Sequence, residues 1–283
     1  MLDNKKITEL KLIAANVRKH ALAGVYNAAS GHPGGSLSIS DVLTLLYFEV
    51  MNVDPKDTKN PDRDRFVLSK GHCAPALYGV LAEKGFLPKV DIATLRKTGS
   101  YLQGHPDMKG TPGVDMSSGS LGQGISAANG MALAGKIDNK DYRVYTILGD
   151  GELQEGQVWE AAMYAAHYKL DNLTAFVDFN GLQIDGNVAD VMSPLPIDGK
   201  FAAFGWNVIV CDGHDFNELL DAINEAKATK GKPTVIVMKT VKGKGVSFME
   251  NNAGWHGNAP SEEQYNQAIA EIDAEIERIK EGA

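Results

Sequence analysis

The stretch VYTILGDGELQEGQVWEAAMYAAHYKLDNLTAFVDFNG, residues 144–181, decides the fold. It holds two short apolar runs, at 144–148 and 174–178, and a segment of crossover length between them. Similar runs follow at 208–211 and 234–238. Alternation of strand, helix and strand is typical of a parallel sheet with helices on both faces. We therefore expect an α/β fold with a mostly parallel sheet.

Hydrophobic periodicity and breaker residues extend this interpretation to the rest of the chain. Helical or crossover segments are expected at 5–30, 40–50, 74–84, 117–135, 156–168, 216–230 and 262–280, and a further short strand at 66–69. Residues 30–35 read as a breaker cluster and 52–65 as a charged surface loop. Isoleucines spaced by three and four should form one packing seam along the last helix. Since no repeat or linker is visible, we predict a single domain over 1–283.

Composition narrows the classes of function. The chain is 43% hydrophobic and 23% charged, as in ordinary globular proteins with a sizeable core. A net charge of −8 argues against a nucleic-acid partner. No apolar run reaches the roughly 18 residues of a membrane span, and the N-terminal stretch lacks the apolar centre of a signal peptide. We therefore expect a cytoplasmic protein with no nucleic-acid or membrane partner.

Polar residues follow two of the predicted strands at their carboxyl ends. The first strand runs into Gly149-Asp150-Gly151, and the second runs through Asp178 and Phe179 into Asn180. Ligands of open α/β sheets bind beyond these ends, and the two tips meet if the strands are neighbours. Asp150, Asn180 and a carbonyl just after Asn180 would then supply hard oxygen ligands of the kind Mg²⁺ prefers. The flanking glycines would let a diphosphate lie against main-chain N–H groups. A Gly-Asp-Gly tripeptide by itself is more often a tight turn, so the prediction depends on the pairing with Asn180.

The segment GDGELQEGQVWEAAMYAAHYKLDNLTAFVDFNGLQIDG resembles the Gly-Asp-Gly…Asn motif of thiamine diphosphate enzymes, in its transketolase version. The resemblance implies a thiamine diphosphate-binding fold and a metal, Mg²⁺ or Ca²⁺, held by Asp150, Asn180 and the main chain of Leu182. The cofactor diphosphate would lie against Gly149, Asp150, Gly151 and Asn180. Phe179 departs from the motif, which more often has Asn or Asp there, but that position is no metal ligand.

Four of the seven histidines lie in glycine-flanked segments: His32, His72, His105 and His256. An isolated histidine is more often structural than catalytic, but four in loops that could share one sheet edge suit a hydroxyl-rich substrate, because imidazoles near neutral pH donate, accept and relay protons. The segments SGHPGG, LSKGHCAPALY, QGHP and WHG are similar to transketolase motifs. The resemblance implies that His32, His105 and His256 contact the sugar substrates, and that His72 and His256 reach the cofactor diphosphate.

The resemblance extends to a loop and to two acidic residues. Residues 118–122 are similar to the loop beside the thiazolium ring, with Gly119, Ser120 and Leu121 at the cofactor, although many relatives have Pro at the place of Ser120. Glu155 and Glu160 match an acidic network between two active sites, although an acid near a helix start also has a purely local explanation. Lys242 and Lys244 could be phosphate contacts or solvated charges. We expect His20, His167, His214 and Cys73 to be structural.

The resemblance covers essentially the whole chain but only the first of three domains of a full-length transketolase. The glutamate that activates the cofactor belongs to the second domain, and no residue here matches it. We therefore expect the N-terminal subunit of a split transketolase that joins a C-terminal subunit, as a heterotetramer, to transfer a two-carbon ketol unit between sugar phosphates of the pentose phosphate pathway. The small-residue segment 117–135 and the isoleucine seam are candidate docking faces.

Two alternatives remain open at this point: half of a 1-deoxyxylulose-5-phosphate synthase-like enzyme, and a non-catalytic cofactor-binding module. The paired GHPGG and WHG segments favour transketolase over the first, and the retained site residues argue against the second. A nicotinamide-binding Rossmann domain is excluded because no GxGxxG follows the first strand.

Overall fold

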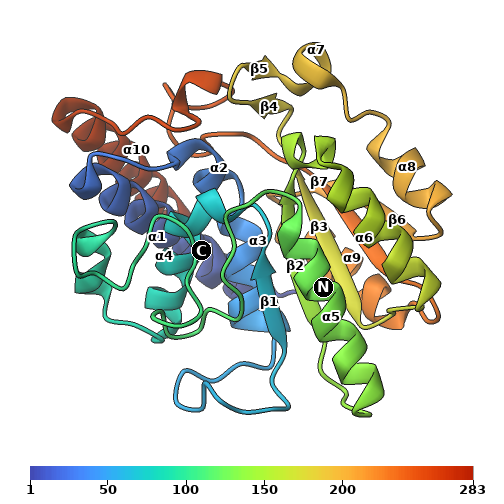
Figure 1. Ribbon diagram of the computed structural model, residues 1–283. Coiled ribbons are helices and arrows are strands. Elements are labelled where there is room, and N and C mark those ends of the chain that lie inside the picture. The colour runs from blue at the N-terminus through green and yellow to red at the C-terminus, as the bar shows by residue number, and fades with distance from the viewer. Residues whose placement is uncertain (283) are drawn as a thin grey trace.

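The computed structural model describes residues 1–282, and its centre is a parallel sheet (Figure 1). The sheet order is β1-β2-β3-β7-β6, and every neighbouring pair is parallel. The strands are β1 (Arg65–Leu68), β2 (Val144–Gly149), β3 (Leu173–Phe179), β6 (Asn207–Asp212) and β7 (Thr234–Lys239). The five predicted strands are therefore confirmed to within one residue at each end, and β2 and β3 are neighbours.

Helices cover both faces of the sheet, as predicted. Alternate side chains of each strand point to opposite faces. Tyr145 and Ile147 of β2 therefore join the core beneath α1, α3, α4 and α9, while Val144 and Leu148 join the core beneath α5, α6 and α8. The helices are α1 (Asn4–Ala28), α2 (Pro33–Ser38), α3 (Ser40–Leu45), α4 (Ala74–Lys84), α5 (Gln123–Ile137), α6 (Gly156–His167), α7 (Val188–Met192), α8 (Ile197–Ala203), α9 (Phe216–Ala228) and α10 (Glu262–Glu281).

Shorter elements complete the description. Short 3₁₀ helices cover Gly71–Cys73, Lys89–Thr94, Gly151–Gln154 and Ala253–Trp255, and a π-helical turn, Leu46–Val50, continues α3. A two-stranded hairpin, β4 (Leu182–Gln183) and β5 (Gly186–Asn187), follows β3. This hairpin, α7 and α8 were not predicted, because each is too short to show a periodic pattern.

Two glycine-rich segments differ from their predictions. The predicted helix at 117–135 is wrong at its start, because α5 begins only at Gln123. Gly119 and Gly122 have φ of +153° and +80°, which no helix allows, and the segment before α5 is a loop. The interpretation of residues 30–35 as a breaker cluster is also wrong in part, because Gly34 and Gly35 lie inside a helix, α2. A Cβ at Gly34 would stand 2.8 Å from the Trp255 carbonyl oxygen, so these glycines serve close packing.

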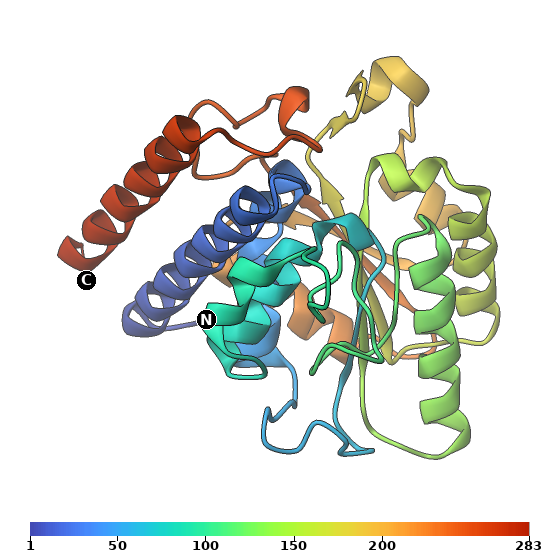
Figure 2. The same cartoon turned by 60° about the vertical axis from the view of Figure 1, so that its left-hand side comes forward.

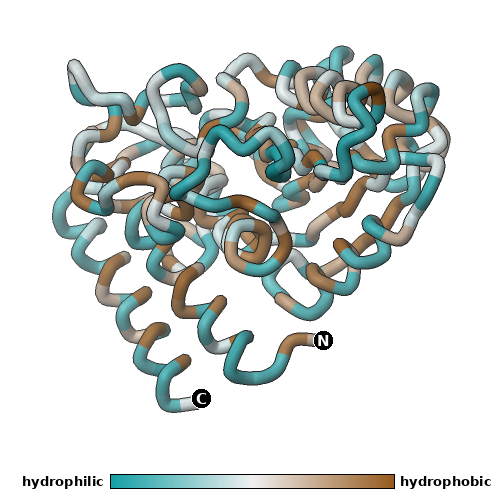
Figure 3. The backbone as a smooth tube through the Cα atoms, turned by 90° about the horizontal axis from the view of Figure 1, so that it is seen from below, coloured by the Kyte–Doolittle hydropathy of each residue, from teal (hydrophilic) through white to brown (hydrophobic). Residues whose placement is uncertain are grey.

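The isoleucine seam of α10 packs on this domain itself (Figures 2 and 3). Figure 2 shows α10 running alongside α1, and Ile272 joins Ala15 and Leu22 of α1 in one buried cluster. Seen from below, α1 and α10 lie next to each other and both carry apolar positions along their length (Figure 3). The seam therefore does not need a partner to be covered. None of the helices in residues 1–282 is long and apolar enough to cross a membrane. The single-domain organisation stays a prediction.

Candidate active site at the carboxyl edge of the sheet

Asp150 and Asn180 meet at the carboxyl edge of β2 and β3. The parallel register places Gly149 beside Asp178, so the residues that follow each strand lie side by side. The Gly181 N–H, just after Asn180, donates to Asp150 Oδ2 at 2.6 Å, and the Gly151 N–H donates to Oδ1 at 2.8 Å. Two loops far apart in the sequence are therefore joined at the Asp150 carboxylate.

The amide of Asn180 has a defined orientation. Its Nδ2 donates to Asp178 Oδ2 at 2.9 Å, and its Oδ1 accepts from the Leu182 N–H at 3.1 Å. The carboxylate of Asp150, the amide oxygen of Asn180 and the carbonyl of Leu182 form a set of hard oxygen donors that suits Mg²⁺ or Ca²⁺. Within residues 1–282 no group of three or more His, Cys, Asp or Glu side chains is placed to hold a metal. A metal here would need this mixed donor set.

Burial shapes the charge of Asp150. Its side chain is almost fully buried, and loss of solvent together with the nearby Asp178 carboxylate raises its pKa to about 6. The main-chain N–H groups of Gly151 and Gly181 and the charge of Lys70 oppose this shift only in part. A cation at this carboxylate would relieve the unfavourable environment.

Asp178 lies beneath the candidate metal ligands as a buried hub. Its carboxylate accepts from Lys70 Nζ at 2.6 Å, from Ser38 Oγ at 2.7 Å and from Thr240 Oγ1. Burial alone would raise the pKa of Asp178, but the Lys70 charge and these hydrogen bonds lower it. Asp178 therefore stays ionised and fixes the Asn180 amide, a role that sequence reasoning missed.

Glu152 is a second buried carboxylate that sequence reasoning missed. It accepts from Ser69 Oγ at 2.5 Å, from the Gly122 N–H at 2.9 Å and from the Gly149 N–H at 3.0 Å. It thus ties the end of β1, the end of β2 and the loop before α5 together. Lys70, Glu152 and Asp178 are charged residues next to a strand end or a glycine turn, and that position is the signal that could have found them.

The four glycine-flanked histidines gather in one cluster, as expected. The ring of His32 lies at its centre, with centroid distances of 5.1 Å to His72, 5.5 Å to His256 and 6.4 Å to His105. His72 and His256 stack at 5.2 Å. The buried Nδ1 of His32 has no hydrogen-bond partner among residues 1–282. An unpaired ring nitrogen in this position is available to a ligand.

All four imidazoles are held neutral. Burial is the main cause and the nearby cations add to it, so that the pKa of His32 falls to about 4 and that of His256 to about 3. Burial and the charge of Lys70 hold the pKa of His72 well below its usual range, and burial and Arg96 lower the pKa of His105. Near neutral pH these rings can therefore both donate and accept hydrogen bonds.

A cavity of about 330 Å³ connects the candidate metal ligands to the histidines. Its walls include most of the positions that the sequence predicts: His32, His72, Gly119, Leu121, Gly149, Asp150, Gly151, Glu155, Asn180, Leu182 and His256. Ser120 is exposed beside the cavity. His105 lies behind Gly119, because a Cβ added at Gly119 would stand 3.1 Å from the His105 ring. Glu155 and Glu160 are both exposed on the first turns of α6.

The structure separates the two lysines that the sequence left undecided. Lys242 is buried in the cavity wall, where its Nζ lies 3.2 Å from the Leu182 carbonyl oxygen and 3.1 Å from His256 Nδ1. Burial and the charge of Lys70 lower its pKa. Lys244 lies on the other side of the same loop and pairs with Glu250 at 3.8 Å. Only Lys242 therefore faces the candidate site.

Comparison with known proteins adds to this geometry. The family described as "Transketolase, thiamine diphosphate binding domain" matches residues 9–275. The chain belongs to the transketolase family. It is therefore part of a thiamine diphosphate-dependent transferase, and the fold and family that the sequence suggested are confirmed.

Relatives of this transketolase chain differ in length. It is 48% identical to the 6-deoxy-6-sulfo-D-fructose transketolase subunit SqwG of a Clostridium species, over 92% of this chain and 94% of that subunit. It is 43% identical to one subunit of the apulose-4-phosphate transketolase of Phocaeicola vulgatus, over 97% of this chain and 98% of that subunit. Human transketolase is 44% identical over 98% of this chain but only 44% of its own length. A solved transketolase structure from Leishmania mexicana superposes with a TM-score of 0.86 at 32% identity, covering 96% of this chain and 45% of that one.

Proposed function

We propose that this chain binds the diphosphate of thiamine diphosphate through Mg²⁺ held by Asp150, Asn180 and the Leu182 carbonyl. The observation that carries the proposal is the convergence of these oxygens at adjoining strand ends, next to a cluster of neutral histidines. Ca²⁺ would suit the same hard donors. The buried ammonium of Lys242 faces the same cavity and would add a positive charge for the diphosphate.

The histidines define what the site does with its substrate. His32, His105 and His256 would contact the hydroxyl and carbonyl groups of a sugar phosphate, because neutral imidazoles exchange protons and hydrogen bonds with such groups. His72, which stacks on His256, would reach the diphosphate. When bound, thiamine diphosphate supplies the nucleophile and electron sink for transfer of a two-carbon ketol unit. The main-chain positions Gly119 to Leu121 would line the cofactor, and Glu155 would contribute to an acidic network at the edge of the cavity.

The remaining parts of the assembly are proposed from the relatives. Two of them are named as transketolase subunits, and the chain spans more than nine-tenths of their length. We propose a complementary C-terminal subunit, which completes each site in a cytoplasmic heterotetramer. The same names concern a sulfonated ketose and apulose 4-phosphate, so a modified ketose is a second candidate substrate beside the sugar phosphates of the pentose phosphate pathway.

The test combines this chain with its complementary subunit, thiamine diphosphate and Mg²⁺. We expect ketol transfer from a ketose phosphate to an aldose phosphate, and no activity from this chain alone. Asp150→Asn, which keeps the side-chain volume, should weaken metal-dependent cofactor binding by at least about a hundredfold in titration calorimetry. Asp141→Asn, at an exposed position, is the matched control. Cofactor binding that is independent of divalent metal would refute the proposal. Release of CO₂ from a 2-oxo acid donor would favour a deoxyxylulose-phosphate synthase-like activity instead.

A further inference from the structure

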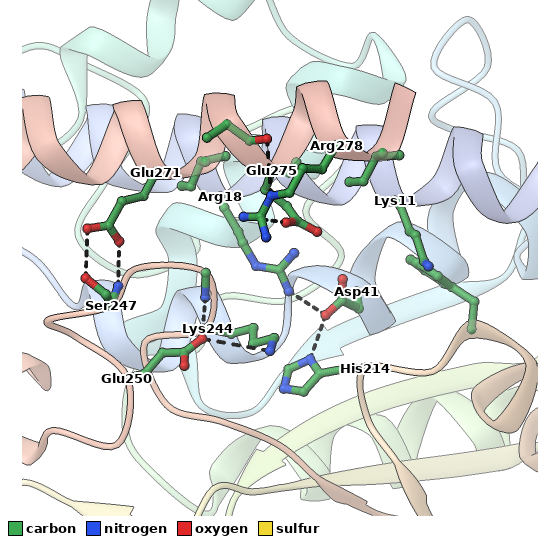
Figure 4. Close-up of a pocket in the computed structure, with 16 residues that line it drawn as sticks. Lys11, Arg18, Asp41, His214, Lys244, Ser247, Glu250, Glu271, Glu275 and Arg278 are labelled. Atoms are coloured by element: carbon green, nitrogen blue, oxygen red, sulfur yellow. Dashed lines mark hydrogen bonds and ion pairs between the residues drawn. The ribbon is translucent and has the colours of Figure 1, made fainter. Parts of the chain in front are cut away.

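A second cavity, of about 610 Å³, lies on the far side of the loop that carries Lys242 (Figure 4). It is bounded by α1, α10 and the loop after β7, and Figure 4 shows Arg18, Asp41 and His214 in contact across its wall. The Arg18 guanidinium pairs with Asp41, and Asp41 Oδ2 lies 2.7 Å from His214 Nδ1. All three side chains are largely buried, with exposed fractions of 10%, 8% and 15%.

The contacts of His214 define its tautomer. The Val241 N–H lies 2.9 Å from His214 Nε2. A main-chain N–H can only donate, so Nε2 must accept and Nδ1 must carry the proton. That proton is donated to Asp41. Although burial opposes ionisation of Asp41, Arg18 and His214 lower its pKa and keep it an acceptor.

The bond to Val241 holds the loop one residue before Lys242. After it, the Gly243 N–H donates to the Gly34 carbonyl at 3.0 Å, and the Asn251 N–H donates to the Lys242 carbonyl at 2.9 Å. The main chain is thus fixed on both sides of Lys242. Its side chain then reaches Leu182 and His256 in the cofactor cavity.

We propose that His214 is a positioning residue for the cofactor site: by holding the Val241 N–H, with Asp41 and Arg18 behind it, it aims the Lys242 ammonium into the cavity. This refines the expectation that His214 is only structural. It rests on the proposed function, in which that cavity takes the diphosphate. His214 itself touches neither substrate nor cofactor.

Two substitutions separate the two contacts of the imidazole. In His214→Gln the longer side chain carries an oxygen to the place of Nε2, where it accepts from Val241. In His214→Asn the shorter amide reaches Asp41 but not Val241. In the assembled enzyme with Mg²⁺, we expect thiamine diphosphate to bind roughly five- to tenfold more weakly to the Asn variant, the effect of about one lost hydrogen bond, and within about twofold of normal to the Gln variant. Equal losses in both variants would overturn the proposal.

A double-mutant cycle shows whether the effect passes through Lys242. In a Lys242→Ala background, His214→Asn should cause no further loss of cofactor affinity. In a Lys244→Ala background it should cause its full loss, because Lys244 points to the other cavity. Additive losses with Lys242→Ala would show that His214 acts by another route and would overturn the proposal.

A third measurement needs no variant. Amide exchange at residue 241 in the unmodified assembly, resolved by overlapping peptides, should be slow because its N–H is bonded to a buried imidazole. Exchange at the rate of an unprotected amide would overturn the proposal.

Asp150→Asn serves as the reference for the measurements of cofactor binding, because it tests the proposed function itself. If it leaves cofactor binding intact, the proposed function fails. If it abolishes binding while His214→Asn has no effect, only the role of His214 fails.

Discussion

Lys70 Nζ lies 2.6 Å from Asp178 Oδ2, and both side chains are withdrawn from solvent, with exposed fractions of 2% and 0%. The pair joins the end of β1 to the end of β3 across β2. Lys70 also donates to the Gly35 carbonyl at 3.1 Å, which attaches α2 to the same point. Lys70 therefore connects the ends of β1 and β3 with α2 at the candidate cofactor cavity, whose wall it also lines.

Loss of Lys70 should destabilise the fold. Lys70→Met keeps the aliphatic length but leaves the Asp178 carboxylate buried without its cation, which should lower the free energy of unfolding by about 3–5 kcal/mol. Urea denaturation measures this change. Lys136→Met is the control, since its pair with Asp171 is partly exposed, and its loss should change stability by about 0–1 kcal/mol. Similar losses in the two variants would contradict the importance of burial.

Glu152→Gln should loosen the loop before α5. The substitution keeps the shape but places an NH₂ group against the N–H of Gly122 or Gly149, both of which need an acceptor. The free energy of unfolding should fall by about 1–3 kcal/mol, the cost of a buried donor without a partner. Limited proteolysis should then cut residues 117–122 faster than in the unchanged chain. Glu160→Gln, on an exposed position of α6, should leave both measurements unchanged.

The histidine cluster should make the chain sensitive to acid. A histidine in the unfolded chain has its ordinary pKa of about 6.5, whereas His32 and His256 in the folded chain have pKa values of about 4 and about 3. Because the unfolded state binds more protons in this window, their contribution to stability is complete above pH 6.5 and is lost as the pH falls toward 4 and 3.

The measurement compares unfolding midpoints at pH 7 and 4.5. The double variant His32→Gln/His256→Gln should lose less stability over this range than the unchanged chain. Between pH 7 and 8 the unfolding midpoints of the two chains should change equally with pH, because these histidines are then neutral in both the folded and the unfolded state. An equal loss of stability between pH 7 and 4.5 in the double variant and the unchanged chain would show that the pKa values of the two rings are not depressed.

The α10 seam should respond to truncation according to burial. Ile272 is 2% exposed against α1, so Ile272→Ala should cost about 2–5 kcal/mol. Ile279 is only partly buried near the end of α10, so Ile279→Ala should lower the free energy of unfolding clearly less. Thermal denaturation with proteolysis of α10 as a local probe distinguishes the two. Equal costs would mean that α10 does not pack on α1 along this seam.

The sequence by itself determined the strands, the family and the residues at the strand tips. Runs such as 144–148 and 174–178 are apolar because a parallel sheet covered on both faces buries them, and that pattern is local in the chain. Asp150 and Asn180 could be paired because each directly follows such a run. The glycine-flanked histidines could be expected at one edge because they lie in glycine-rich loops that resemble transketolase motifs.

Only the tertiary structure decided which charges are buried and what they hold. Lys242 and Lys244 are two residues apart in one loop, yet one faces the candidate site and the other the opposite cavity. Asp178 became a hub because Ser38, Lys70 and Thr240 meet it from three distant segments. The free energy of a buried charge depends on the groups around it, and those groups are set by how the elements pack, which no local pattern contains.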